Sequence, residues 1–352
     1  MSAKKNSPIK AASPRKPKVG VIGMGPVGMI LAVKLKEAGF DVSVVVRNSV
    51  KREKISTEGI VLENLYQSVT HFDHVFPSIG EMAEVDLDYL IFSTKSYQTA
   101  EAVKEAELLN SDKLTVVAAQ NGIDVEELVT ASFGDGQVLR MVVNFAGNMI
   151  APNTVRVNFF LPPNYIGSID ETRTDEAATL ASKLTSVGLQ SESVNSFELA
   201  KRVWEKTILN SSLSALCGVG RLTMAEAMAD ADTVQLIEET INEGINVAEK
   251  EKIRFPDDFL RKCLRYLKKG GDHFPSLAVD LIHNRPTEID YFNGKIVEYG
   301  RKHYVRTSLN LSMTNMVKAM TNKNVISRLP GAIGDFNKRM IQKGLVDKTK
   351  SP

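Results

Sequence analysis

The segment Gly23-Met24-Gly25-Pro26-Val27-Gly28 constrains the fold more than any other part of this chain. It follows the apolar run 19–22 and opens a segment with helical spacing of apolar residues, 27–38, which ends at Gly39. Strand, glycine turn and helix in this order are the context in which G-x-G-x-x-G predicts a dinucleotide site. The glycines allow a tight turn, close approach of a pyrophosphate and close helix–strand packing, and the helix N-terminus faces the phosphate charge. A structural turn without a ligand is the alternative.

The end of the next predicted strand, 41–46, indicates which dinucleotide binds. An NAD site usually places an acid about 20 residues beyond the glycines, on the ribose 2′-hydroxyl. Here the strand leads into Arg47, with Lys51 and Arg52 close behind, whereas Asp41 lies at the start of the strand. A guanidinium can hold a 2′-phosphate through charge-assisted hydrogen bonds, so we predict NADP(H) rather than NAD(H). An ordinary solvated basic turn is the alternative.

Composition excludes several classes of protein. The 352 residues, 43% of them hydrophobic, suffice for two domains with cores. The formal net charge of +2 creates no field that favours nucleic acid, and no stretch is apolar enough to span a bilayer, so we expect neither a nucleic-acid nor a membrane partner. The two cysteines, Cys217 and Cys263, and the five scattered histidines lack metal-binding spacing. We therefore expect that no metal is bound. We also expect that both thiols are free and that the protein lies in a reducing compartment, the cytoplasm.

The order of predicted elements divides the chain into three parts. Residues 1–17 are basic and lack the apolar core of a secretory signal, which favours a disordered tail over a transit peptide. Residues 18–193 alternate strand and helix, which predicts a Rossmann-type, doubly wound α/β domain. Residues 194–345 show helical spacing, which predicts an all-α substrate domain. Strands are expected at 18–22, 41–46, 88–93, 114–119, 154–157 and 165–167, and helices of the second domain at 197–217, 232–252, 257–269, 275–284, 288–301 and 311–320.

Polar side chains occur where a doubly wound sheet binds its ligands, beyond the carboxyl ends of the strands. Arg47, Lys95 and Asn121 each follow a predicted strand. The cleft between the two predicted domains is therefore the expected active site.

One predicted helix presents a polar face. Lys206, Asn210 and Ser214 recur at i, i+4 and i+8, so they share one side of the helix 197–217. Hydride attack on a carbonyl builds negative charge on oxygen, which an ammonium can neutralise and then protonate. Lys206 is thus a candidate proton donor, and a solvent-facing polar stripe is the alternative.

Three blocks of the sequence resemble the ketopantoate reductase (2-dehydropantoate 2-reductase) family: 23–28, the segment Trp204-Glu205-Lys206-Thr207-Ile208-Leu209-Asn210, and 275–294 with its Ser276-to-Glu288 spacing. The resemblance extends over most of residues 18–320. It implies NADPH-dependent reduction of 2-dehydropantoate to pantoate in pantothenate biosynthesis, with Lys206 as proton donor. A homodimer is compatible with it.

The predicted site combines the residues argued above with those that the resemblance implies. The catalytic residues are Lys206 and Glu288. The substrate contacts are Asn121, Asn210, Ser214 and Ser276. The cofactor contacts are Gly23, Met24, Gly25, Pro26, Val27, Gly28, Arg47, Lys95, Gln98, Asn121 and Glu288.

Local roles are the alternatives for several of these residues. Thr287 is a plausible N-cap that would leave Glu288 in the first turn of a helix, and Ser276 could cap the helix that follows Pro275. Asp280 is expected to be structural, paired with a basic side chain.

Departures from the family pattern lie mainly on the predicted substrate side. Ser214 and His273 stand where the family often has asparagine. A related 2-oxo acid reductase, such as a D-2-hydroxy-acid dehydrogenase of the same fold, is therefore one alternative. A nucleotide-sensing protein without turnover is another.

Overall fold

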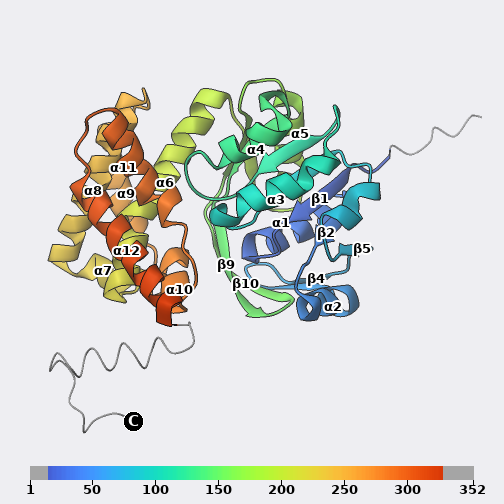
Figure 1. Cartoon of the computed structure of the whole chain (residues 1–352), viewed down its shortest axis with the longest axis horizontal. Helices are drawn as coiled ribbons and strands as arrows, with labels where there is room; N and C mark the ends of the chain where they lie inside the picture. The colour runs from blue at the N-terminus through green and yellow to red at the C-terminus, as the bar shows by residue number, and fades with distance from the viewer. Residues whose placement is uncertain (1–14, 328–352) are drawn as a thin grey trace, which may run out of the picture.

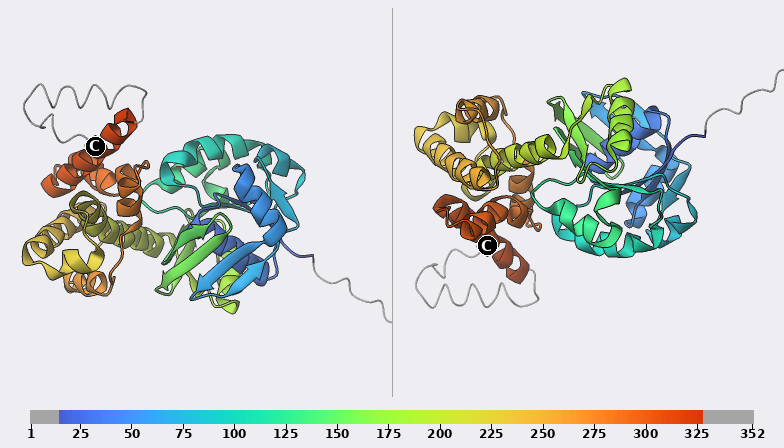
Figure 2. Two further views of the ribbon diagram at one scale, coloured as in Figure 1. Left: turned by 90° about the horizontal axis from the view of Figure 1, so that it is seen from below. Right: turned by 90° about the horizontal axis from the view of Figure 1, so that it is seen from above.

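The computed structural model describes residues 15–327, which form a sheet-containing half and a helical half (Figure 1). Figure 2 shows the same division from two further sides, with helix α6 (Ser196–Gly220) running from one half into the other. The fold class predicted from the sequence, a Rossmann-type α/β part followed by an all-α part, is confirmed. The predicted tail, 1–17, lies almost entirely outside the described residues, and so does the last part of the predicted all-α domain, 328–345. The exact domain boundary at 193/194 stays a prediction.

The main sheet has eight strands in the order β12-β11-β8-β7-β6-β1-β2-β5, and each neighbouring pair is parallel except β8 and β11. Its central strands are buried on both faces, as runs rich in β-branched residues require. The strands predicted at 18–22, 41–46, 88–93, 114–119 and 165–167 all lie in this sheet. The bounds are β1 (Lys18–Ile22), β2 (Asp41–Val45), β5 (His74–Phe76), β6 (Tyr89–Phe92), β7 (Thr115–Ala118), β8 (Val138–Val142), β11 (Asn164–Ser168) and β12 (Ser191–Ser193).

A second sheet, in the order β4-β3-β10-β9, was not predicted. Its strands are β3 (Ile60–Asn64), β4 (Ser68–Thr70), β9 (Phe145–Ala151) and β10 (Thr154–Phe160). The strand expected at 154–157 is present as part of β10 and belongs to this second sheet. The long-range pairing of β3 with β10 creates the sheet, and no local pattern encodes such a pairing.

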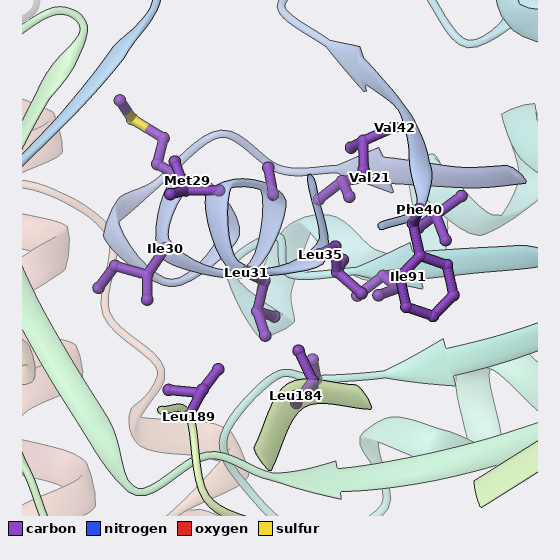
Figure 3. Packing of buried hydrophobic residues seen from close by; sticks show 14 of the residues in the cluster. Val21, Met29, Ile30, Leu31, Leu35, Phe40, Val42, Ile91, Leu184 and Leu189 are labelled. Atoms are coloured by element: carbon purple, nitrogen blue, oxygen red, sulfur yellow. The ribbon is translucent and has the colours of Figure 1, made fainter. Parts of the chain in front are cut away.

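Helix α1 (Pro26–Glu37) is buried on nearly every side, with residues 28–35 all buried. Figure 3 shows its side chains Met29, Ile30, Leu31 and Leu35 among residues of the main sheet, of helix α5 (Thr174–Ser186) and of the segment that follows it. A helix covered all round needs no amphipathic pattern. This packing fixes the N-terminus of α1 at the glycine turn. The other helices of this half are α2 (Ser49–Glu58), α3 (Thr99–Ala106) and α4 (Val125–Phe133).

The helical half contains every helix predicted there and one more. The additional helix, α7 (Met224–Ala229), starts with a capping box between Thr223 and Glu226, a signal that the sequence does carry. The helix predicted at 288–301 is divided into a 3₁₀ turn, η5 (Ile289–Tyr291), and α11 (Asn293–Lys302), because the backbone of Phe292 is not helical. The remaining helices are α8 (Ala231–Lys250), α9 (Phe259–Lys268), α10 (Ser276–Ile282) and α12 (Ser308–Ser327).

The two halves meet where the chain leaves β7. Ile123 lies in the same apolar cluster as Trp204 and Ile208 of α6. The Ile123 amide donates to the carbonyl of Tyr291, 3.2 Å away. The carboxylate of the next residue, Asp124, forms an ion pair with Lys295 of α11 and accepts a hydrogen bond from the hydroxyl of Tyr299 on the same helix. The segment around η5 and α11 is therefore held against the end of the parallel sheet. Within residues 15–327, no helix has the length and apolar character needed to cross a bilayer.

Candidate active site

The glycine turn between β1 and α1 fits a dinucleotide phosphate. Gly23 has φ of +99°, and a Cβ there would lie 2.5 Å from the amide nitrogen of Thr94. A Cβ on Gly28 would lie 1.9 Å from the carbonyl oxygen of Gly23. A Cβ on Gly25, by contrast, would have nothing within 4 Å. The outer glycines are thus required by the protein itself, whereas the middle one leaves open space at the backbone, as a bound pyrophosphate needs.

The N-terminus of α1 is available to an anion in the same place. Gly25 is its N-cap and offers no capping side chain, and Pro26 occupies the first turn. The free amides of that turn and the helix dipole therefore have no partner from a capping group. Met24 is buried and Val27 packs against the core, so a ligand at the predicted cofactor residues 23–28 would meet backbone rather than side chains.

Arg47 lies beside the glycine turn, because β1 and β2 are paired in parallel and Ile22 is opposite Val45. Its guanidinium is half exposed and faces α3, with Nη2 3.0 Å from Oε2 of Glu105 and Nη1 3.9 Å from Oε1 of Glu101. Exposed ion pairs of this kind contribute little and exchange readily. A 2′-phosphate would compete with these carboxylates for Arg47.

Lys51 is a second cation at the glycine turn. Its amine donates a hydrogen bond to the carbonyl of Met24 and has no carboxylate partner among the described residues. Burial lowers the pKa of Lys51 to about 8. The side chain of Asn48 caps α2 by accepting from the Lys51 amide at 2.9 Å, which holds this first helical turn near the glycines. A buried ammonium without an anion is suited to a phosphate, and the sequence showed Lys51 only as one of several basic residues.

A cluster of charged side chains follows β6. The amine of Lys95 lies 2.7 Å from Oδ2 of Asp280 and 3.2 Å from Oε2 of Glu288. Arg285 contacts the other oxygen of Asp280 at 2.9 Å, so the expected pairing of Asp280 with a basic side chain is confirmed. Burial opposes the charge of Lys95, but Glu288 and Asp280 outweigh it and raise its pKa above the ordinary value. Lys95 therefore joins the two halves through carboxylates, and Gln98, predicted with it, is exposed.

Glu288 is held from the sheet half. Its Oε1 accepts the amide of Ser96 at 3.0 Å and lies 2.9 Å from the Ser96 hydroxyl, which is 2.8 Å from the carbonyl of Asn121. Glu288 precedes the 3₁₀ turn η5 and does not lie in the first turn of a helix capped by Thr287, so that local role was wrong. The reason is tertiary, because the amide that satisfies the carboxylate comes from the loop after β6. Ser96, which the sequence analysis missed, connects Asn121 to Glu288.

The polar face predicted on α6 is present and partly buried. The amine of Lys206 makes no hydrogen bond and no ion pair in the described part of the chain, and burial lowers its pKa to about 8 against the opposing charge of Glu205. Asn210 is half-buried and Ser214 is 6% exposed, and their side chains likewise have no polar partner within residues 15–327. Because Lys206 and Asn210 are half-buried and Ser214 is buried, this face is not a polar stripe open to bulk solvent.

The structure brings some predicted site residues together and leaves others apart. Lys95, Asn121 and Glu288 meet around Ser96, while no hydrogen bond or ion pair in the described residues links this group to Lys206. Ser276 is exposed at the start of α10 and does not cap it, because Pro275 takes the N-cap position. Two open surface hollows, lined by residues 110–112 and 61–64 with their neighbours, lie away from all of these side chains. The predicted interdomain cleft stays a prediction.

Comparison with known proteins gives a consistent result. Residues 19–171 match the sequence profile "Ketopantoate reductase PanE/ApbA", and residues 198–321 match its C-terminal counterpart. The 2-dehydropantoate 2-reductase of Aquifex aeolicus is 28% identical over 311 residues, covering 85% of this chain and 95% of that protein. The one from Pyrococcus horikoshii is 25% identical and covers 86% and 97%.

Solved structures share the fold. A PanE/ApbA family ketopantoate reductase from Ralstonia eutropha has a TM-score of 0.78 at 23% identity, covering 87% of this chain and 99% of that one. D-mandelate dehydrogenase, solved with NADH and anilino(oxo)acetate, has the same TM-score at 21% identity and the same coverage. Because the two sequence profiles together span most of the chain and fall on its sheet-containing and helical parts, this protein belongs to the ketopantoate reductase family.

Proposed function

We propose that this protein uses NADPH to reduce the C2 carbonyl of a 2-oxo acid, with 2-dehydropantoate as substrate and pantoate as product. The observation that carries the proposal is Lys206, an amine with a pKa of about 8 and no carboxylate partner in the described residues. Such an amine combines a positive charge at neutral pH with a proton that it releases more readily than an ordinary lysine does. Membership of a reductase family supplies the reaction in which this combination is useful.

The glycine turn would hold the pyrophosphate of the dinucleotide, and Arg47 and Lys51 would hold the 2′-phosphate. The fit rests on the open space at Gly25, the uncapped start of α1 and the ammonium of Lys51, which has no carboxylate partner among the described residues. When bound, the reduced nicotinamide supplies a hydride to the carbonyl carbon. The proposal of NADP(H) over NAD(H) is supported by two cations and no acid directly after β2.

Lys206 would stabilise the oxyanion and then protonate it. Negative charge grows on the carbonyl oxygen as the carbon is reduced, and a nearby ammonium in a desolvated site lowers the free energy of that transition state. Transfer of the Lys206 proton to the oxygen completes the hydroxyl group and leaves a neutral amine. Glu288 would accept a hydrogen bond from the substrate or from the nicotinamide ribose, as the family resemblance implies.

The substrate carboxylate needs hydrogen-bond donors. Asn210 and Ser214 lie one and two turns beyond Lys206 on α6, with side chains that make no other polar contact in the described region. Within residues 15–327, the main-chain carbonyl of Asn121 accepts from Ser96 and its side-chain amide has no hydrogen-bond partner, so this amide could bind a ligand. Ser276 is exposed and would have to be brought to the substrate. These four residues would bind the 2-oxo acid.

A second candidate function is the reduction of a bulkier 2-oxo acid. D-mandelate dehydrogenase matches the fold as well as the ketopantoate reductase does, and Ser214 leaves more space than an asparagine would. The difference between the two candidates lies in the acyl substituent, which α6 would contact.

The test is oxidation of NADPH in the presence of a panel of 2-oxo acids, with 2-dehydropantoate, pyruvate and phenylglyoxylate as members. We expect kcat/KM for 2-dehydropantoate to exceed the others by at least about tenfold, which is ~1.4 kcal/mol of transition-state discrimination. A preference for phenylglyoxylate would establish the second candidate. Absence of turnover with every 2-oxo acid would refute both and favour a nucleotide-binding protein. The cytoplasmic location, expected from the cysteine content, and the homodimer stay predictions.

A further inference from the structure

Ser96 is a buried residue that the proposed function does not yet use. It has no exposed surface and lies in the 3₁₀ turn η2 (Ser96–Gln98), directly after the loop that follows β6. Its contacts join two segments of the sheet half to one segment of the helical half, through Asn121 and Glu288. Because both partners of this buried hydroxyl are predicted site residues, Ser96 is a candidate for a role in the site.

The hydrogen count at Ser96 is informative. A serine hydroxyl carries one hydrogen, yet two acceptors lie within bonding distance, the Asn121 carbonyl at 2.8 Å and Oε1 of Glu288 at 2.9 Å. The hydroxyl can therefore donate fully to only one of them at a time. If Glu288 turns towards a ligand, the hydroxyl still has the carbonyl as its partner. The hydroxyl then keeps an acceptor, whereas the Ser96 amide would lose Oε1, so this amide favours the position that Glu288 has in the structure.

The lone pairs of Glu288 show where a ligand can bind. A carboxylate has about four acceptor positions, two on each oxygen. Oε1 has both the amide and the hydroxyl of Ser96 within bonding distance, whereas Oε2 has the amine of Lys95 as its one partner among the described residues. Oε2 is therefore the oxygen with more acceptor capacity left for a ligand.

We propose that Ser96 is the positioning residue of Glu288, holding Oε1 so that Oε2 is presented to a hydroxyl group of the substrate or of the nicotinamide ribose. This inference rests on the proposed function, since it assigns Glu288 to the reductase site. Ser96 does not touch the reacting atoms and acts through Glu288.

The test is a double-mutant cycle with Ser96→Ala, Glu288→Gln and the double variant, each assayed for kcat and KM with NADPH and 2-dehydropantoate. Ser96→Ala should lower kcat/KM about tenfold, as expected for a lost hydrogen bond to a charged group, and should change the same parameter that Glu288→Gln changes. The double variant should be no slower than Glu288→Gln alone. Ser96→Thr keeps the hydroxyl and should recover most of the activity.

Ser168→Ala is the matched control. Ser168 is also fully buried, and its hydroxyl bonds stay within the sheet half, to Asp170 and Arg173. It should keep kcat/KM within about twofold even where its stability falls. A kcat/KM of Ser96→Ala within twofold of the wild-type value would overturn the proposal. It would also be overturned if Ser96→Ala lowered kcat/KM by the same factor in the Glu288→Gln background as in the wild type.

The same cycle is also measured by urea unfolding, so that the outcome does not depend on turnover. Non-additive unfolding free energies would show that Ser96 holds Glu288 even in a protein that reduces no 2-oxo acid. In that case the proposed function fails and the contact stands. Additive values would overturn the positioning role whatever the activity.

Discussion

Raising the pH from 7 to 9 should lower kcat/KM for the 2-oxo acid about tenfold, because Lys206 must be protonated to act in the proposed mechanism. With a pKa of about 8, about 90% of this amine carries its proton at pH 7 and about 10% at pH 9. A lysine with the ordinary value of 10.5 would still be about 97% protonated at pH 9, and the rate would change by only a few per cent. The two cases are thus easily separated.

The assay is kcat/KM for the 2-oxo acid between pH 6 and 10 at saturating NADPH, because this parameter reports the pKa of Lys206 before the anionic substrate binds. Activity should be present below pH 8 and lost as the pH rises through it, since the lowered pKa belongs to a group that acts in its charged form. Lys206→Arg is the control, because a guanidinium keeps its charge over this range but does not give up its proton. It should be slow with a flat profile. A wild-type profile that is flat to pH 9.5, or a fall that Lys206→Arg shares, would refute the reasoning.

Three further predictions concern the glycine turn, the cation Lys51 beside it and the buried amine of Lys206. Lys51→Met should weaken NADPH binding at least as much as Arg47→Met does, because Lys51 has no carboxylate partner in the described residues. Binding of NADH, measured like that of NADPH by intrinsic fluorescence, should stay within about twofold. Equal losses of affinity for both nucleotides would show that Lys51 does not bind the 2′-phosphate. Gly28→Ala should lower the free energy of unfolding by ~1–3 kcal/mol, since its methyl group would lie 1.9 Å from a carbonyl oxygen. Gly25→Ala should keep the stability and lose nucleotide affinity, and equal stabilities of the two variants would contradict this packing. Lys206→Met should raise the thermal midpoint of unfolding at pH 7, because burial opposes the charge of the lysine. This gain should shrink between pH 8 and 10.5, because folding of the wild type releases the Lys206 proton in that range. A gain that does not depend on pH would argue against a desolvated amine.

The predictions from sequence were most accurate where a pattern is local. The strand at 18–22 is found with the same bounds, and helices were expected for most of the second half. Both follow from periodicity and from the glycine turn, which depend on residues close together in the chain. The second sheet was missed because β3 and β10, which are about 90 residues apart, are short and become a sheet only by pairing with each other.

The candidate site shows the same division. The sequence indicated Lys206 as a member of a polar helix face, and the glycine turn as a phosphate site, from spacing alone. It showed neither the carboxylates that hold Lys95 nor the amide that holds Glu288, because Asp280, Glu288 and Ser96 come from separate segments. The local interpretation of Glu288, in the first turn of a helix capped by Thr287, was wrong for that reason.

The sequence by itself therefore determined the fold class, the family and the residue types available for hydride chemistry, since each of these depends on short-range patterns. Only the tertiary structure decided which charges are paired, which are buried and which remain free for a ligand. Burial and pairing depend on what the rest of the chain places around a side chain, and Lys95 and Lys206, two lysines with opposite pKa shifts, show how much that surrounding matters.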